Sequence, residues 1–347
     1  MSTTRTAKLR ALFGTVSIAG LLVAGAAQAK DTLTVVSFGG SYQDAQREAM
    51  FKPTAEALGI DIKEDTLNGL AEVRLQVRSG TVSWDVVDLG ATECAIGAAE
   101  GLFEPLDYSV IKAEGIAKPM VNDEWIGIIY YSTVLSWNKK LDKHPQTWAD
   151  FWNTKDFPGS RSLRNNPQVM MELALLADGV PLDKLYPLDV DRAFEKLEEI
   201  KPHITTWWSS GAQSAQLMKD GEVDMIAIWN GRLSAAMKDG ANADYTYEQG
   251  LLNADCLAIP KGSKNVELAQ KAIAMFVSPE QQAALPKYIN YGPVNAVAFD
   301  LDVLTPEQKA ALNSSPENMK KQAVIDAQWW GENGADLQER WDSFTQQ

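Results

Sequence analysis

The chain has 347 residues, of which 32 are basic and 46 acidic, and its formal net charge is −14. A chain this acidic repels phosphate, so the composition argues against nucleic-acid binding. Its length is too great for one small core and predicts two domains or one large one.

The N-terminal segment predicts an exported protein. It opens with three basic residues and no acidic one: Arg5, Lys8 and Arg10. An apolar run over residues 11–27 follows, and Ala27-Gln28-Ala29 is a small-x-small cleavage site. This order is typical of a secretory signal peptide. The run is shorter than the about 20 apolar residues of a spanning helix. We therefore expect residues 1–29 to be a signal peptide cleaved after Ala29, and the mature protein to be periplasmic.

Strands and helices alternate through the first part of the mature chain. Short β-branched runs predict strands at 33–37, 60–66 and 84–89. Apolar residues at helical spacing predict helices at 42–58 and 70–78. This alternation is typical of an α/β fold with a mainly parallel sheet.

The second part of the chain repeats this organisation. The β-rich stretch 126–137 is longer than a usual strand and could run from one domain into another. A new α/β unit is expected to begin at 159–163, with a later strand at 225–229. Residues 257–260 predict a strand, which is a candidate for a second crossing between the two domains, and residues 317–344 predict a helix.

Two α/β units with long strands between them suggest two lobes joined by a hinge. We expect lobe I to comprise residues 30–133 plus 257–303, and lobe II to comprise residues 134–256 plus 304–347. Small ligands usually bind in the cleft between such lobes. Closure of the hinge around the ligand is the expected motion.

The chain has two cysteines, Cys94 and Cys256. An even number of cysteines in an oxidising compartment allows one disulfide. Two separate buried thiols are the alternative, because sequence alone does not show that the two residues are close. The expected pairing is Cys94 with Cys256.

The sequence contains little that would support catalysis. Its two histidines, His144 and His203, each lie beside a proline in a polar loop, and no G-x-S-x-G elbow is present. No H-E-x-x-H, C-x-x-C or phosphate-binding glycine motif occurs. We therefore expect a protein that is not an enzyme and that holds no metal or other cofactor.

Aromatic and polar residues recur at the ends of the predicted strands, where the crevice of an open α/β sheet lies. The candidate ligand-binding residues on this criterion are Phe38, Gly39, Gly40, Tyr42, Asn165, Asn166, Trp229, Asn230, Arg232 and Asp255.

Each of these candidates also has a structural interpretation. The two glycines form either a plain tight turn or a turn whose backbone N–H groups approach a ligand. Trp229 is either a core residue or a cover for a ligand, and a tryptophan in the cleft would suit a cation. Asp255 is either a capping residue or a ligand carboxylate.

Several segments resemble the periplasmic polyamine (spermidine/putrescine)-binding proteins of ABC importers, in the same order along nearly the whole mature chain. They are Gly39-Gly40-Ser41-Tyr42, Trp84-Asp-Val-Val, Gly101-Leu-Phe-Glu-Pro-Leu-Asp107, Gly221-Glu-Val-Asp-Met-Ile-Ala-Ile-Trp-Asn-Gly231, Asp255-Cys-Leu-Ala-Ile-Pro260 and Tyr291-Gly-Pro-Val-Asn295. The resemblance implies a type II periplasmic binding fold, in which two α/β lobes are joined by a two-strand hinge. It also implies that Tyr42, Trp229 and Tyr291 contact the ligand and that Asp255 pairs with an amine.

The chain departs from this family at three positions. Asn253 and Gly39 stand where polyamine binders have tryptophans, and Asn166, or Asn165 beside it, stands where they have a carboxylate. A dication held at both ends should require carboxylates at both ends. Glu93 could replace the missing group.

Arg232 adds to this departure. If its side chain faces the cleft, it would favour a ligand carboxylate or phosphonate; otherwise it is a solvated residue of the following helix.

The sequence therefore predicts a periplasmic solute-binding protein that captures a polyamine-like or other small amine ligand by hinge closure. The alternative ligand is a zwitterionic amino acid, an opine or a phosphonate. The expected partner is the membrane permease of an ABC importer, and we expect a monomer. The rivals are a secreted enzyme on the same fold and an iron carrier that would use the pair Tyr130-Tyr131.

Overall fold

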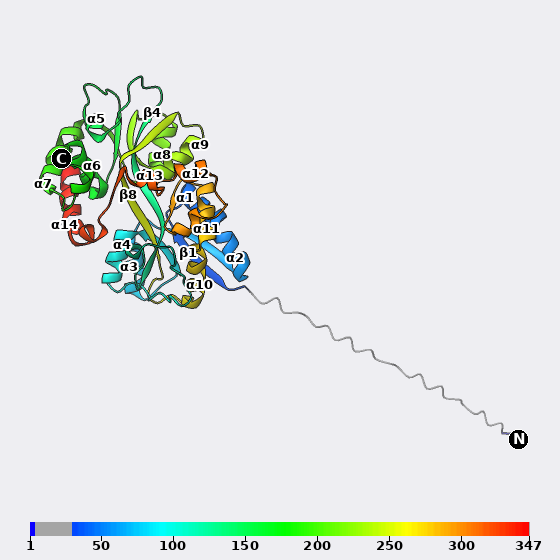
Figure 1. Ribbon diagram of the computed structural model, residues 1–347. Coiled ribbons are helices and arrows are strands. Elements are labelled where there is room, and N and C mark those ends of the chain that lie inside the picture. The colour runs from blue at the N-terminus through cyan, green and yellow to red at the C-terminus, as the bar shows by residue number, and fades with distance from the viewer. Residues whose placement is uncertain (4–29, 347) are drawn as a thin grey trace. The chain divides into compact units, whose positions relative to one another are not determined.

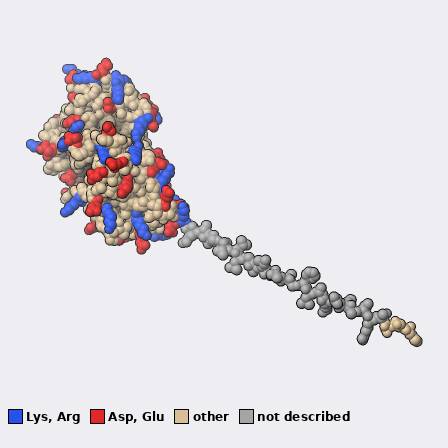
Figure 2. Space-filling model, turned by 45° about the vertical axis from the view of Figure 1, so that its right-hand side comes forward, with Lys and Arg blue, Asp and Glu red and all other residues tan. Residues whose placement is uncertain are grey.

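The structure is a computed structural model that describes residues 1–3 and 30–346. The predicted signal peptide and its cleavage site lie outside these residues. The folded unit begins at Asp31. Within the described part of the chain, no helix is both long enough and apolar enough to cross a membrane. Basic and acidic side chains are interspersed over the face of the molecule seen in Figure 2.

One mixed β-sheet runs through the folded unit. Its strand order is β2-β1-β3-β8-β4-β7-β5-β6, and two short strands extend it, β9 beside β4 and β10 beside β8. The strands are β1 (Thr32–Ser37), β2 (Asp61–Thr66), β3 (Val86–Gly90), β4 (Trp125–Asn138), β5 (Arg161–Arg164), β6 (Ile204–Trp208), β7 (Met225–Trp229), β8 (Ala243–Ala258), β9 (Gly292–Pro293) and β10 (Gln322–Val324).

Two long strands, β4 and β8, connect two parallel halves of this sheet. At one end β1 pairs in parallel with β2 and β3, and at the other β5 pairs in parallel with β6 and β7. β4 and β8 pair antiparallel along almost their whole length, from Trp125 opposite Ala258 to Asn138 opposite Ala243. Figure 1 shows both strands running from one group of helices to the other.

Helices cover both halves of the sheet (Figure 1). They are α1 (Gly40–Gln46), α2 (Lys52–Leu58), α3 (Leu70–Ser79), α4 (Ala91–Ala99), α5 (Trp148–Trp152), α6 (Pro167–Ala177), α7 (Val190–Ile200), α8 (Gly211–Lys219), α9 (Asn230–Lys238), α10 (Val266–Phe276), α11 (Pro279–Ala284), α12 (Pro306–Ala311), α13 (Pro316–Met319) and α14 (Ala327–Gln346). A π-helical segment, Arg47–Phe51, joins α1 to α2.

Helix α7 illustrates how the sequence determines these elements. Asp189 caps its N-terminus by accepting a hydrogen bond from the backbone N–H of Arg192. Phe194, Leu197 and Ile200 then recur at helical spacing and are buried. The helix therefore buries one apolar stripe against the core and leaves its charged residues in solvent.

Each parallel half of the sheet has its own hydrophobic cores. Around β1 and β3 the cores include Leu33 and Val86 and also Val87. Around β5 and β7 they include Leu163 and Ile228. The two halves can thus be stable bodies that β4 and β8 connect.

The predicted α/β class is confirmed, and the long strand expected at 126–137 is observed as β4. Two sequence-based boundaries were wrong. The strand expected at 257–260 is the end of β8, which begins at Ala243 and tolerates Gly250 because β10 pairs with it there. The helix expected at 317–344 is divided into α13 and α14, because the residues between them form β10, which pairs with β8.

The predicted disulfide between Cys94 and Cys256 is present, with its two Cα atoms 6.6 Å apart. It links α4 to β8 within the core around β3. Because 162 residues separate the two cysteines, the bond joins parts of this core that are distant in sequence.

Candidate ligand-binding cleft

A cavity of about 220 Å³ lies between the two parallel halves of the sheet. The parallel strands β1, β3, β5 and β7 all end at or beside it, as expected for ligand sites of α/β sheets. β4 and β8 pass through it. Its lining residues are Phe38, Tyr42, Asn68, Gly90, Thr92, Glu93, Tyr131, Arg164, Asn166, Gln168, Trp229, Arg232, Asn253, Asp255 and Tyr291.

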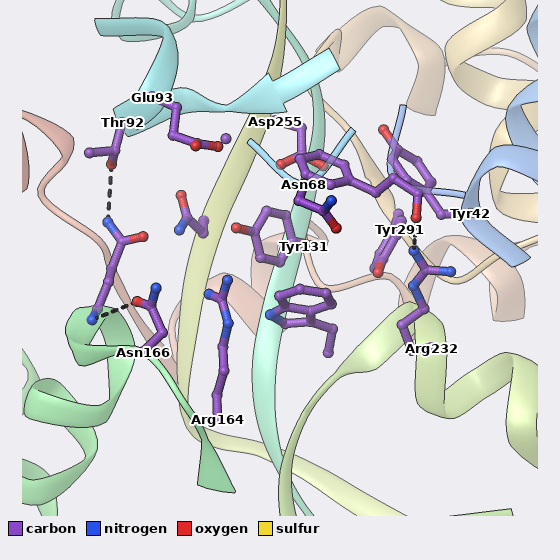
Figure 3. Close-up of a pocket in the computed structure, with 15 residues that line it drawn as sticks. Tyr42, Asn68, Thr92, Glu93, Tyr131, Arg164, Asn166, Arg232, Asp255 and Tyr291 are labelled. Atoms are coloured by element: carbon purple, nitrogen blue, oxygen red, sulfur yellow. Dashed lines mark hydrogen bonds between the residues drawn. The ribbon is translucent and has the colours of Figure 1, made fainter. Parts of the chain in front are cut away.

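The structure brings together eight of the twelve residues that the sequence proposed for the site. Those that line the cavity are Phe38, Tyr42, Glu93, Asn166, Trp229, Arg232, Asp255 and Tyr291. They come from both halves of the sheet, and Figure 3 shows most of them converging on one space.

The other four proposed residues do not line the cavity. Gly39 and Gly40 have φ angles of 63° and 57° and turn the chain into α1, so the tight-turn interpretation applies to them. Asn165 accepts a hydrogen bond from the indole N–H of Trp341. Asn230 is buried and accepts one from the backbone N–H of Ser132. These contacts support the walls of the cavity.

Seven lining residues were not among the proposed twelve: Asn68, Gly90, Thr92, Tyr131, Arg164, Gln168 and Asn253. Arg164 directly follows the strand expected at 159–163, so the strand-end criterion could have identified it. Asn253 was noted only as a departure from the polyamine binders. Tyr131 lines the cavity whereas Tyr130 does not, since successive residues of a strand face opposite sides.

Asp255 places a carboxylate in the cavity. It lies on β8 opposite Gly90, is 6% exposed, and its side chain has no hydrogen-bond partner among the described residues. Burial raises the pKa of Asp255 well above its usual value, and the nearby Asp88 and Glu93 raise it further. A cation in the cavity would lower this pKa and stabilise the charged form.

Glu93 provides a second carboxylate, from the first turn of α4. Its Oε1 accepts a hydrogen bond of 2.9 Å from the backbone N–H of Leu70. Burial raises the pKa of Glu93, and this backbone hydrogen bond opposes the shift.

Asp88 lies below the cavity floor and is fully buried. Its Oδ2 accepts hydrogen bonds from the Ser37 hydroxyl at 3.1 Å, the Tyr42 hydroxyl at 2.8 Å and the Gln46 amide at 2.7 Å. Burial raises the pKa of Asp88 to about 7, against the effect of these three donors. The network orients the ring of Tyr42, which lines the cavity.

Arg164 enters the cavity from the end of β5. No hydrogen bond or ion pair of its side chain exists within the described residues. Its guanidinium carbon lies 5.0 Å from the ring centroid of Trp229 and 5.8 Å from that of Trp208. Burial lowers the pKa of Arg164, but an arginine remains charged in proteins. The cavity therefore contains a cation whose donors face no acceptor from the described residues.

Arg232 has a different environment, although it also lines the cavity. It is 4% exposed, so the interpretation as a solvated helix residue is wrong. Its Nη1 donates to the carbonyl of Gly39 at 3.1 Å and to the hydroxyl of Ser41 at 3.3 Å. A Cβ at Gly40 or at Gly211 would lie 2.9 or 2.7 Å from this guanidinium, so both glycines provide the space it needs.

An aromatic wall completes the site. The Tyr131 ring packs edge-on against Trp229, with centroids 5.8 Å apart, and the Tyr42 ring packs edge-on against Tyr291 at 5.3 Å. Aromatic faces near a desolvated ammonium attract it. The cavity thus offers groups for both a cation and an anion. The described residues contain no cluster that could hold a metal ion.

A cleft of this kind, between two α/β bodies joined by two long strands, defines a solute-binding protein that encloses a small ligand. Residues 49–317 match the family described as bacterial extracellular solute-binding protein. The chain therefore belongs to this family, and the predicted fold and solute-binding function are confirmed.

Three similar proteins support this assignment. The gamma-aminobutyric acid-binding protein of Pseudomonas aeruginosa is 38% identical over 342 residues, which cover 96% of each chain. The spermidine/putrescine-binding periplasmic protein of Escherichia coli is 26% identical over 248 residues, or 68% of this chain and 69% of the relative. The crystal structure of an ABC transporter substrate-binding protein from Bradyrhizobium japonicum is 48% identical, covering 90% of this chain and 99% of that one, with a TM-score of 0.87. The predicted resemblance to the polyamine-binding proteins is confirmed.

Proposed function

We propose that this chain is the periplasmic solute-binding protein of an ABC importer, and that its ligand is a small zwitterionic amino acid or amino-acid derivative. The observation that carries this proposal is the pair Arg164 and Asp255. Both line the cavity, they have opposite charges, and neither side chain has a hydrogen-bond partner in the described part of the chain.

Unpaired buried charges are unfavourable unless a partner of opposite charge binds them. A ligand carboxylate would accept paired hydrogen bonds from the planar guanidinium of Arg164. A ligand ammonium would pair with Asp255 and lie against the aromatic wall. A zwitterion thus satisfies both groups at once.

The size of the cavity agrees with a small ligand. A volume of about 220 Å³ has room for about seven water molecules. It is below the roughly 300–1,000 Å³ of pockets for drug-sized molecules. The names of similar proteins, a gamma-aminobutyric acid-binding protein and an ABC transporter substrate-binding protein, also support the proposal.

A polyamine is the second candidate, because Glu93 and Asp255 both line the cavity beside aromatic rings and a 26% identical relative is named for spermidine and putrescine. Against it, the buried charge of Arg164 would repel an ammonium group in the same cavity.

We further propose that residues 30–133 plus 257–303 and residues 134–256 plus 304–347 are the two lobes that close on the ligand. Two hydrogen bonds support this, because each joins the proposed lobes beside the cavity. Gln168 donates to the Thr92 hydroxyl at 3.1 Å, and Arg232 donates to the Gly39 carbonyl. In this proposal the protein is a monomer without catalytic activity, is cleaved after Ala29, and delivers its ligand to a membrane permease.

A calorimetric titration series tests the ligand class. The purified mature protein is titrated with 4-aminobutyrate, a panel of α-amino acids, putrescine and spermidine. We expect at least one zwitterion to bind in the micromolar range or tighter, and the Arg164→Met variant to lose that binding. Tight binding of the polyamines alone would overturn the proposed ligand class.

A further inference from the structure

One part of the cavity wall contains neutral hydrogen-bonding groups that a simple amino acid would leave unused. From this we infer that the ligand carries, besides its ammonium and carboxylate, a neutral polar group such as a hydroxyl or a carboxamide. The inference rests on the proposed function, because it takes Arg164 and Asp255 as the partners of the ligand charges.

Asn253 is the first of these groups. It lies two residues before Asp255 on β8, so the two side chains share one face of the strand. Its Oδ1 accepts a hydrogen bond from the backbone N–H of Ala254 at 2.8 Å. Its Nδ2 has no acceptor among the described residues, although the side chain lines the cavity and is only 8% exposed.

Asn166 and Gln168 are the second and third groups, at the start of α6. The Oδ1 of Asn166 caps the helix by accepting from the backbone N–H of Gln168 at 2.9 Å, which leaves its Nδ2 as a donor. The Nε2 of Gln168 donates to Thr92, which leaves its Oε1 as an acceptor. In the described part of the chain, neither remaining atom has a partner.

The backbone at this point is shaped to present these amides. Val169 has a φ of 76°, and Gln168 has a non-helical ψ of 134°. A β-branched residue with positive φ is a strained conformation, and such strain concentrates at functional sites. The deviation lies within the first turn of α6, next to the two residues that face the cavity.

All three amide side chains line the same cavity. Figure 3 shows Thr92, Glu93 and Asn166 on one side of it, with Tyr42, Tyr291 and Arg232 on the other. The cavity therefore presents two amide donors, from Asn166 and Asn253, and one carbonyl acceptor, from Gln168. A hydroxyl or a carboxamide can both donate and accept, so it would satisfy groups of both kinds.

A site built to bind such a group should discriminate against ligands that lack it, because its polar atoms are then left unpaired. Calorimetric titration of the full mature protein with matched pairs of compounds tests this. The pairs are norvaline with glutamine, and 4-aminobutyrate with 4-amino-3-hydroxybutyrate. We expect the polar member of at least one pair to bind about tenfold or more tightly than its apolar counterpart.

Two variants locate the effect. Asn253→Leu removes one donor at similar volume, and Asn166→Ser removes the other while keeping a side-chain oxygen that can cap α6. We expect each variant to reduce the preference to about threefold or less, and to leave the affinity for the apolar member within about twofold. Asn122→Leu is the matched control at an exposed position outside the cavity, and thermal unfolding checks that all three variants are folded.

The possible outcomes separate the two proposals. If zwitterions bind but each apolar member binds as tightly as its polar counterpart, the inference is wrong and the proposed function stands. Equal losses for both members of a pair in Asn166→Ser or Asn253→Leu would also overturn it, because these residues would then hold the ligand carboxylate. If only polyamines bind, the proposed ligand class is wrong, and the inference that rests on it is wrong as well.

Discussion

The two arginines of the cavity, Arg164 and Arg232, carry the same charge but differ in their hydrogen bonds to the protein. Two of the three guanidinium nitrogens of Arg232 are occupied by the protein: Nη1 donates to the Gly39 carbonyl and the Ser41 hydroxyl, and Nη2 donates to the Phe38 carbonyl. Its buried Nε has no partner within the described residues. The guanidinium of Arg164 lies near the rings of Trp229 and Trp208 and has no hydrogen-bond partner within the described residues. The comparison shows that lining a cavity does not make a charge available to a ligand. The hydrogen bonds that a charged side chain already makes with the protein decide whether it can bind a ligand.

The strongest test of this comparison is removal of the unpartnered arginine. In Arg164→Met a ligand carboxylate would lose its charged partner while the packing against Trp229 is largely kept. Loss of one partner of a buried charge pair costs about 2–5 kcal/mol or more. We therefore expect the dissociation constant of a zwitterionic ligand, measured by titration calorimetry, to rise by roughly 100-fold or more. An unchanged affinity would remove Arg164 from the ligand site.

The carboxylate partner should give the next largest effect. Asp255→Asn keeps the shape of the side chain and removes its charge. A hydrogen bond to a charged group contributes about 1.5–3 kcal/mol, so an amine-bearing ligand should bind roughly 10- to 100-fold more weakly. A derivative in which the amine is acetylated serves as the comparison and should be affected less. Equal losses for both compounds would contradict an ammonium partner at this position.

Substitution of the occupied arginine should give a smaller and less selective effect. Arg232→Gln removes the hydrogen bonds to the β1–α1 turn, which join the proposed lobes. We expect about tenfold weaker binding of every ligand, charged or neutral. The substitution destabilises the closed form of the protein and does not remove a contact to one particular group of the ligand. The measurement is the ratio of affinities for a zwitterion and its carboxamide. A selective loss for the carboxylate would show that Arg232 also binds the ligand.

The smallest expected effect is on the pH dependence of stability, through the buried Asp88 that accepts a hydrogen bond from Tyr42. Its pKa is raised to about 7, so between pH 6 and 7 the folded state holds a proton that the unfolded state has released. Stability falls with rising pH wherever the folded state binds more protons. Over this interval the free energy of unfolding of wild type should fall by about 1 kcal/mol relative to Asp88→Asn. Urea unfolding at the two pH values measures the difference, and parallel behaviour of the two proteins would contradict it.

Much of the fold followed from sequence patterns because those patterns are local. Strand 126–137 is a long β-rich run that is buried along most of its length, and helix α7 buries residues at helical spacing, so both could be identified without their neighbours. The start of β8 could not be identified in this way. Its residues around Gly250 are in a strand because β4 and β10 pair with them, and those partners are distant in sequence.

The site residues that could be predicted were likewise those identified by local sequence patterns. Trp229 and Asp255 lie at strand ends or on the crossing strand, which is where such residues line a crevice. The role of Arg232 could not be predicted, because it depends on the Gly39 carbonyl, 193 residues away, and on the space left by Gly40 and Gly211. Gln168 was missed because an irregular first turn of α6 directs it into the cavity.

The disulfide lies directly beside the two acidic residues that line the cavity. Cys94 directly follows Glu93, and Cys256 directly follows Asp255. Closing so long a loop removes entropy from the unfolded chain, and for 162 residues the loop model gives a stabilisation of about 5 kcal/mol. The bond therefore holds together the two backbone segments that carry these carboxylates.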